Sequence, residues 1–176
     1  MKPDEKYLII PSFSPENKPL GYKSAITANA AMDIAAAVDS LNMDKNILSD
    51  IKPNGYQKTL EKITHLISCL PVYMFDKSGA IKEWSMNEYK ENNAHRHISH
   101  LYCAWPSSET QHNHALASAC RQAIINRNRE NTGKDDTASH GWIHKALVEA
   151  RLKNPEAVYN TLLLLFKSGI FYNTFF

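Results

Sequence analysis

The sequence lacks an excess of charge of either sign, which restricts the partners it can bind. Its 176 residues include 20 lysines and arginines against 18 aspartates and glutamates, and both signs are spread along the chain. A surface for nucleic acid needs a cluster of basic side chains. The most basic stretch holds Arg121, Arg127 and Arg129, and we interpret it as the solvated end of a helix, where cations suit the dipole. The composition therefore argues against nucleic acid as a partner.

The sequence also lacks cysteine pairs and long apolar runs. Cys69, Cys103 and Cys120 are an odd number without CxxC spacing, which argues against a disulfide framework and against a thiolate zinc site. We interpret all three as small core residues. The apolar run at 161–166 is far shorter than the roughly 20 residues that span a membrane. The first residues contain no signal-peptide core, so the sequence leaves the location of the protein unknown.

Glycine is scarce, with six residues, and four of the eight prolines lie within the first 19 positions. These prolines predict a loop to about residue 23, with a short strand at 7–10. Beyond the loop, the apolar spacing predicts about five substantial helices in an all-α domain that covers 1–176. The predicted helical stretches are 24–41, 56–68, 97 to about 107, one that Ser107 or Ser108 caps, 142–152, and one that Asn154 caps, Pro155 begins and Gly169 ends.

The stretch HRHISH at 95–100 concentrates three imidazoles and a guanidinium in six positions. Three interpretations are open: a metal site, a pocket of hydrogen-bond donors for a hydroxyl-rich ligand, and a buried hydrogen-bonded corner. A zinc site needs three or four ligands in fixed geometry. No spacing ties the other histidines to this stretch, and Arg96 adds a positive charge that a dication would not favour. These points weigh against the metal without deciding between the other two.

Two further stretches carry carboxylates that can take part in chemistry. In PSFSPEN at 11–17, two prolines brace a short loop that ends in Glu16 and Asn17. A carboxyl group on such a loop, in a partly dry pocket, can give a proton to a leaving oxygen. In AIKEW at 80–84, Trp84 stands beside Glu83, and its ring can either stack on a sugar or belong to the core. The stretch at 137–142 is interpreted as a polar loop that enters a helix.

Taken together and in this order, the motifs resemble a known family. PSFSPEN, Met32-Asp33 on a helix, GAIKEW, HRHISHLY, HGW at 140–142 and ARL at 150–152 are similar to the catalytic domain of glycoside hydrolase family 95. The resemblance covers roughly residues 8–176, and SPEN and HRHxSHL are its most specific parts. Family members are inverting α-L-fucosidases and relatives, built on an (α/α)6 barrel and mostly exported.

The resemblance implies roles for particular residues. Glu16 matches the general acid that protonates the glycosidic oxygen, and Arg96 and His97 match residues that hydrogen-bond the sugar. Asn17 and Trp84 are further candidate substrate-binding residues. The resemblance implies no metal and no other cofactor. The expected substrate is a glycan that ends in α-linked fucose or a related sugar, and an α-galactoside is a close alternative because Cys103 and Ala104 depart from the family pattern.

The resemblance also implies that this chain holds only about half of the barrel. The asparagine and aspartate that activate water in the family fall upstream and downstream of the matched motifs, and the apolar ending GIFYNTFF resembles a segment inside the family's domain. We therefore expect a fragment with negligible turnover, with uncovered apolar faces that favour self-association. Two alternatives stay open: a non-catalytic helical carbohydrate-binding module, and a metal-dependent hydrolase that uses the HRHISH histidines.

Overall fold

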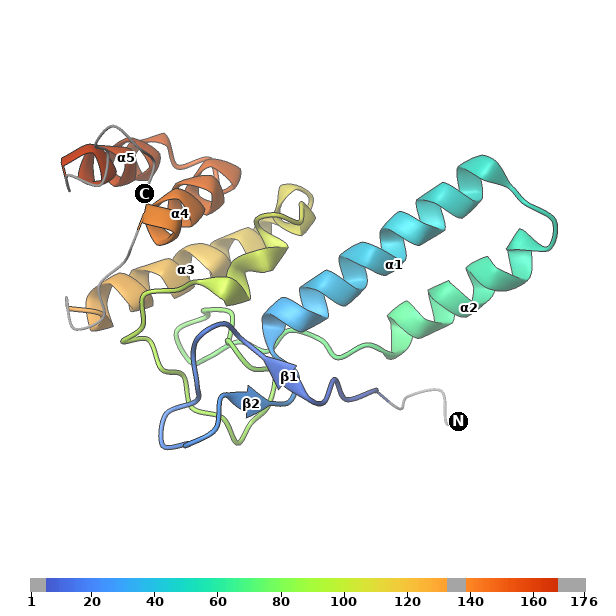
Figure 1. Ribbon diagram of the computed structural model, residues 1–176, viewed down its shortest axis with the longest axis horizontal. Coiled ribbons are helices and arrows are strands. Elements are labelled where there is room, and N and C mark those ends of the chain that lie inside the picture. Colours follow the sequence, from blue (N-terminus) through green and yellow to red (C-terminus); the bar gives the residue numbers. More distant parts are fainter. Residues whose placement is uncertain (1–5, 133–138, 168–176) are drawn as a thin grey trace.

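A computed structural model describes residues 6–132 and 139–167 (Figure 1). Within these residues the chain is mostly helical, as predicted, and strand is limited to one two-stranded antiparallel sheet and two isolated bridges. The elements in chain order are β1 (Ser12–Phe13), β2 (Ile26–Thr27), α1 (Ala31–Ile51), α2 (Tyr56–Cys69), the 3-10 helices η1 (Ser99–Cys103) and η2 (Glu109–Gln111), α3 (His114–Glu130), α4 (Ser139–Arg151) and α5 (Pro155–Lys167).

Helices α1 and α2 form an antiparallel hairpin that projects to one side of the molecule (Figure 1). Helix α1 ends where Lys52 turns into the left-handed region, with φ of 49°, and its N–H bonds the Leu48 carbonyl. Pro53 follows and cannot continue the helix. Gly55, with φ of 77°, then supplies the second left-handed turn from which α2 begins. The predicted helix over 56–68 is confirmed.

The predicted helix over 24–41 is shifted, because its first residues are held by long-range contacts. Ile26 and Thr27 pair with β1 instead of entering a helix. The Asn29 side chain accepts a bond from the Ile9 N–H at 2.8 Å, and the Asn29 N–H bonds the Ile9 carbonyl at 3.0 Å. Helix α1 therefore starts only at Ala31 and runs ten residues beyond the predicted end, to Ile51.

The strand predicted at 7–10 is also displaced. Residues 7–10 form no regular strand, and the strand of the sheet is Ser12–Phe13, a short distance further along the chain. Ser12 is fixed there because its hydroxyl donates to Asp33 at 2.5 Å and accepts from the Ala30 N–H at 2.8 Å. The sheet thus joins the start of α1 to the loop that carries Glu16.

The helices of the C-terminal half begin at residues other than those the sequence indicated, with one exception. Asn113, not Ser107 or Ser108, caps α3, since its side chain accepts a bond from the Leu116 N–H at 3.0 Å. Helix α4 begins at Ser139, so His140 and Gly141 are helical rather than loop, and the helix predicted from Trp142 starts three residues earlier. The exception is α5, where Asn154 accepts from the Ala157 N–H at 3.3 Å and Pro155 takes the first position, as predicted. The expected stop at Gly169 and the apolar stretch 169–176 lie outside the described residues.

The hydrophobic core lies where the start of α1, η1, α3 and α4 meet, while α4 and α5 pack together as a second hairpin (Figure 1). Fully or nearly fully buried core side chains include Ala35, Ile81, Ile98, Leu101, Leu116, Ile124, Val148 and Leu152. Cys69, Cys103 and Cys120 are buried with free thiols, which confirms their interpretation as core residues. The 3-10 helix η1 takes the place of the helix expected between 97 and about 107, and it delivers residues 95–100 to the edge of this core.

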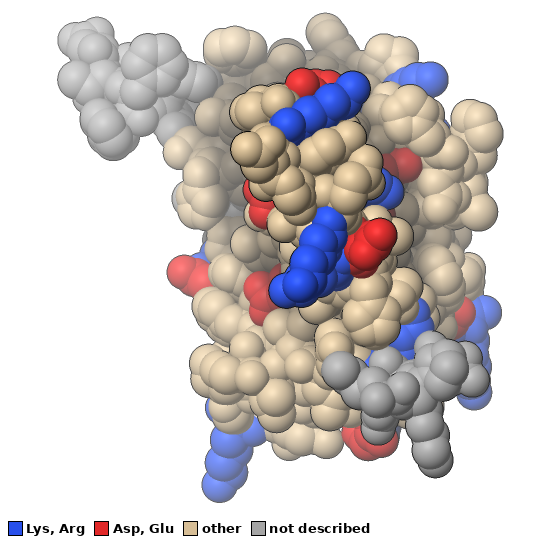
Figure 2. Space-filling model, turned by 90° about the vertical axis from the view of Figure 1, so that its right-hand side faces the viewer, with Lys and Arg blue, Asp and Glu red and all other residues tan. Residues whose placement is uncertain are grey.

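Figure 2 shows the side of the molecule on which the α1–α2 hairpin projects. On this face basic and acidic side chains are interspersed among a larger area of other residues, without a basic stripe. Apolar side chains stay exposed on the hairpin and on α5, among them Met43, Ile47, Ile51, Tyr159, Leu164 and Phe166. Within the described residues, no helix combines the length and the apolar character needed to cross a bilayer.

Candidate active site

Glu16 stands on a tight loop directly after β1. The Asn17 N–H bonds the Ser14 carbonyl at 2.7 Å and closes the turn around Pro15 and Glu16. The Glu16 side chain is 62% exposed, so its carboxylate faces solvent while its neighbours Ser14 and Asn17 are buried. The loop therefore presents a single carboxylate to the outside.

Arg96 and His97 approach the same carboxylate from a segment eighty residues away in the chain. Arg96 Nη2 donates to Glu16 Oε2 at 2.6 Å, and His97 Nε2 lies 3.6 Å from the same oxygen. The Ser99 hydroxyl donates to the Pro15 carbonyl and ties the two segments together beside this contact. The structure thus brings Glu16, Arg96 and His97 into one cluster.

The surroundings of His97 favour the neutral form of its imidazole. Burial lowers its pKa from the usual 6.5, and the neighbouring Arg96, His95 and His140 lower it further, against the opposing effect of Glu16. The His97 ring lies 5.3 Å from the ring of His95 and 5.1 Å from that of His140, measured between centroids. A neutral ring has one N–H donor and one acceptor nitrogen, which suits hydroxyl groups.

Two hollows adjoin the cluster. One of about 140 Å³ is lined by His95, Arg96, Asn128, Trp142 and Lys145, among others, and is rich in nitrogen donors. The other, of about 240 Å³, opens beside Pro15 and Ser99, and apolar and aromatic side chains form most of its wall: Met32, Tyr102, Trp105 and Pro106. Donors on one side and apolar surface on the other are the features that binding sites for small neutral ligands combine.

Asn17 and Trp84 lie in the interior rather than in this exposed cluster. Asn17 is 2% exposed, and its side-chain amide forms hydrogen bonds with Glu83 and Asn92. Trp84 is fully buried, with an edge-to-face contact to Tyr89 at 6.3 Å between centroids. Its indole has no open face on which a sugar could stack, so the core alternative describes this residue better.

The histidines of HRHISH point to different neighbours instead of converging. His97 faces Glu16, whereas His100 is 2% exposed and contacts Arg127. Among the described residues, no group of three or more histidine, cysteine, aspartate or glutamate side chains is arranged to hold a metal ion. The ligand geometry that a metal site requires is therefore not found in this part of the chain.

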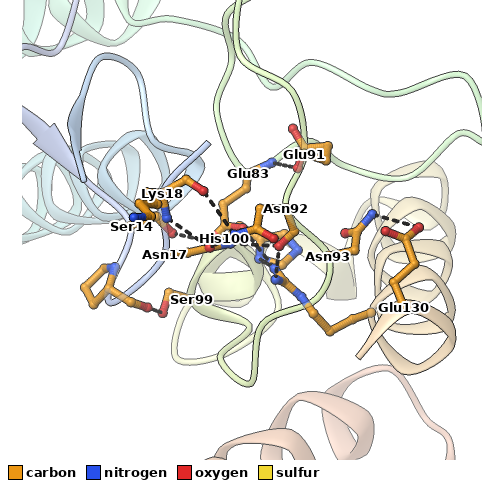
Figure 3. Close-up of polar contacts among 12 residues, drawn as sticks. Ser14, Asn17, Lys18, Glu83, Glu91, Asn92, Asn93, Ser99, His100 and Glu130 are labelled. Carbon is orange, nitrogen blue, oxygen red and sulfur yellow. Dashed lines mark hydrogen bonds and ion pairs between the residues drawn. The ribbon is translucent and has the colours of Figure 1, made fainter. Parts of the chain in front are cut away.

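A buried ion pair lies beside the loop that carries Glu16, and Figure 3 shows its carboxylate partner Glu83 next to Ser14, Asn17 and His100. Arg127 Nη2 donates to Glu83 Oε2 at 2.9 Å, and the two side chains are 5% and 1% exposed. Ser14, Asn17 and His100 bond to this pair, and we call these five residues the Glu83 network. The interpretation of Arg127 as part of a solvated helix end was wrong for this residue, because its side chain is 5% exposed, whereas Arg121 and Arg129 of the same stretch are exposed.

The sequence contained a partial signal for this network. Glu83 was a candidate because of its place beside Trp84, but its partner on α3 was not recognised. Residue type alone does not distinguish a buried arginine from a solvated one among several in a polar helix end. Helical spacing does distinguish Arg127. It lies four residues after Ala123 and three after Ile124, which places it on the apolar face of α3 with Ala119 and Cys120.

Comparisons with known proteins find one matching family and a relative in a plant. The model of the glycosyl hydrolase family 95 catalytic domain matches residues 1–176. The chain is also 29% identical over 161 residues to a protein of Arabidopsis thaliana named alpha-L-fucosidase 2. That alignment covers 89% of this chain but only 18% of the Arabidopsis protein, so the chain spans about a fifth of the length of this relative.

Proposed function

The chain belongs to glycosyl hydrolase family 95, and from this membership we propose that it supplies part of the sugar-cleaving site of an inverting exo-glycosidase of the α-L-fucosidase type. Its helical hairpins α1–α2 and α4–α5 are the kind of unit from which an (α/α)6 barrel is assembled. We propose that residues 1–176 form a portion of such a barrel, with a glycan as substrate.

In this proposal Glu16 is the general acid. Cleavage of a glycosidic bond needs a proton on the leaving oxygen, and a carboxyl group supplies it in most glycoside hydrolases. Glu16 is held at the tip of a rigid loop and is open to solvent, so an incoming glycan can reach it. The arginine and histidine beside it provide N–H groups for sugar hydroxyls. The convergence of Glu16, Arg96 and His97 from distant segments is the observation that carries the proposal.

The apolar hollow beside Pro15 supports fucose over a fully hydroxylated hexose. Fucose carries a methyl group where galactose carries a hydroxymethyl group, and a buried hydroxyl without a partner is costly. Met32, Tyr102, Trp105 and Pro106 offer mainly apolar surface there. We therefore propose that a methyl-bearing sugar fits this wall better than its hydroxylated counterpart.

An inverting enzyme also needs a base that activates water, with the two catalytic groups about 6.5–9.5 Å apart. Within the described residues, Glu16 is the one carboxylate of the Arg96–His97 cluster, and no second carboxylate contacts it there. The resemblance assigns the water-activating residues to parts of the family domain outside this sequence. We therefore expect residues 1–176 alone to bind the sugar but to hydrolyse aryl α-L-fucosides negligibly.

The test is to measure L-fucose binding to residues 1–176 by NMR titration. Wild type should show saturable shifts at the His97 ring, and Arg96→Met should weaken binding by about tenfold or more, the value of a lost charge-assisted hydrogen bond. Arg129→Met, an exposed arginine outside the cluster, is the control and should not change binding. Absence of L-fucose binding at millimolar concentration would contradict the proposal.

The non-catalytic carbohydrate-binding module is a second candidate, because the donor cluster and the two hollows would serve it equally well. A full family domain in which the present segment replaces the matching one separates the two functions. An acid role for Glu16 predicts that Glu16→Gln abolishes cleavage of an aryl α-L-fucoside in that protein. Sugar binding without cleavage in that protein, with an affinity that Glu16→Gln leaves unchanged, would favour the binding module, whereas cleavage that persists in Glu16→Gln would refute the acid role of Glu16.

A further inference from the structure

The Glu83 carboxylate accepts hydrogen bonds from both ends of the loop that carries Glu16. The Ser14 hydroxyl donates to Glu83 Oε1 at 2.7 Å, and Asn17 Nδ2 donates to Glu83 Oε2 at 2.6 Å (Figure 3). Ser14 and Asn17 are the residues that flank Pro15 and Glu16. One buried side chain, 69 and 66 residues away in sequence, therefore fixes both ends of the turn that presents Glu16.

The same carboxylate is anchored on its other side by α3. Arg127 Nη2 bonds Glu83 Oε2 at 2.9 Å and lies 3.3 Å from His100 Nδ1, while Arg127 Nη1 donates to the Asn92 carbonyl at 2.9 Å. A guanidinium can only donate, so His100 Nδ1 is the acceptor and the imidazole carries its proton on Nε2. His100 closes the HRHISH stretch, so the network joins the Glu16 loop to the segment that carries Arg96 and His97.

The electrostatics of the network favour a charged Glu83 and a neutral His100. Burial raises the pKa of Glu83, but the charge of Arg127 and the bonds from Ser14 and Arg127 outweigh it and leave the pKa below its usual value. Burial, together with Arg127, lowers the pKa of His100 to about 3 against the opposing effect of Glu83. The carboxylate form of Glu83 accepts the bonds from Ser14 and Asn17.

We propose that Glu83 is a positioning residue that sets where Glu16 stands relative to Arg96 and His97, acting through Ser14 and Asn17. Its meaning for catalysis rests on the proposed function, whereas the positioning itself does not. A purely structural ion pair would stabilise the fold but would leave the distance between Glu16 and His97 unchanged when one of its bonds to the loop is removed.

The titration of His97 reports on that distance without any sugar. Glu16 Oε2 lies 3.6 Å from His97 Nε2 and is the group that raises the His97 pKa against burial, Arg96, His95 and His140. His144 also faces His97 from α4. If Glu16 moves away, the pKa of His97 falls. We expect Glu16→Gln to define the full downward shift in an NMR titration of residues 1–176.

Ser14→Ala removes one bond to the loop and leaves the Glu83–Arg127 pair in place, so the fold should persist. We expect it to lower the His97 pKa by at least half of the Glu16→Gln shift, and Glu83→Gln to do so at least as strongly where that variant folds. Asn126→Ala is the matched control. Asn126 is 2% exposed, precedes Arg127 on α3 and bonds Ser78 and Gln122, neither of which belongs to the Glu16 loop, so its replacement should lower stability without moving the titration.

A His97 pKa that stays at the wild-type value in folded Ser14→Ala, or that moves upward, overturns the positioning role. A shift of the same size in Asn126→Ala overturns it as well, because any loss of stability would then suffice. The proposed function fails separately. If wild type does not bind L-fucose but Ser14→Ala still lowers the His97 pKa, the sugar site is refuted and the positioning role of Glu83 is not.

Discussion

The α1–α2 hairpin and the Glu83 network are held together in opposite ways. In the hairpin, α2 buries only Cys69, α1 buries only residues of its first turns, and Met43 and Ile47 stay 59% and 47% exposed. In the network, every side chain is buried and each bond joins residues far apart in the chain. The hairpin rests on local helix formation and a shallow apolar seam, whereas the network rests on long-range polar bonds without water to replace a lost partner.

This difference indicates at which residues a substitution should lower the free energy of unfolding most. A half-exposed apolar residue loses little when it is truncated, because part of its surface was already in water. A buried charge that loses its partner is costly, because nothing else solvates it. We therefore expect substitutions in the network to cost far more stability than equally drastic substitutions in the hairpin. Four stability measurements test this expectation.

The largest effect is expected for Arg127→Met. It leaves the Glu83 carboxylate buried without its counter-charge, so the free energy of unfolding should fall by about 3–5 kcal/mol. Arg129→Met on the same helix removes an arginine whose partner Glu130 is partly exposed and should cost less than about 1 kcal/mol. Urea denaturation followed by circular dichroism measures both. Equal losses would remove the contrast between buried and exposed pairs.

Leu101→Ala tests the apolar core beside the network. Leu101 is fully buried on η1, and truncation of such a residue typically costs about 2–5 kcal/mol through lost burial and the cavity left behind. Ile47→Ala, on the exposed part of α1, should cost less than half as much. The same denaturation experiment compares the two variants, and a larger loss for Ile47→Ala would show that the hairpin is covered in solution.

Glu91 gives the protein a pH-dependent stability next to the network. Its Oε2 accepts the Glu83 N–H at 2.8 Å, and burial, aided by the charge of Glu83, raises its pKa from 4.5 to about 7. The folded state then keeps a proton that the unfolded chain releases, so stability falls as pH rises from about 4.5 to about 7 and is constant above. The loss is at most about 3 kcal/mol.

Glu91→Gln removes the titrating group and should flatten that slope, with its largest gain relative to wild type above pH 7. Thermal unfolding followed at several pH values between 4.5 and 8 measures the slope in both proteins. A slope that survives unchanged in Glu91→Gln would assign the pH dependence to another group.

The smallest effect concerns the start of α3. Asn113 accepts from the Leu116 N–H, so Asn113→Ala should cost about 1 kcal/mol, the usual value of a helix cap. Ser108→Ala, at the position the sequence favoured, should be close to neutral because the Ser108 side chain makes no cap bond. Urea midpoints compare the pair. The reverse order would restore the original cap prediction.

The errors of sequence reasoning share one cause. Residues 24–30 have helical composition, yet the sheet with β1 and the bonds between Asn29 and Ile9 keep them out of the helix. Ser108 and Asn113 are both acceptable caps, and only the packing of α3 selects the second. Local preference decides an element when nothing distant competes with it, as in α2 and at the Asn154 cap of α5.

The sequence alone predicts that the chain is mostly helical, that a helix runs over 56–68, that Asn154 and Pro155 begin the last helix, and which motifs relate the chain to family 95. These are properties of short stretches, set by spacing and side-chain type. The tertiary structure was needed to show that Arg96 and His97 both approach Glu16 Oε2. It also shows that Trp84 lies in the core and that Arg127 is the buried partner of Glu83. Such contacts join residues tens of positions apart, and pairing over that distance is fixed by how the whole chain packs.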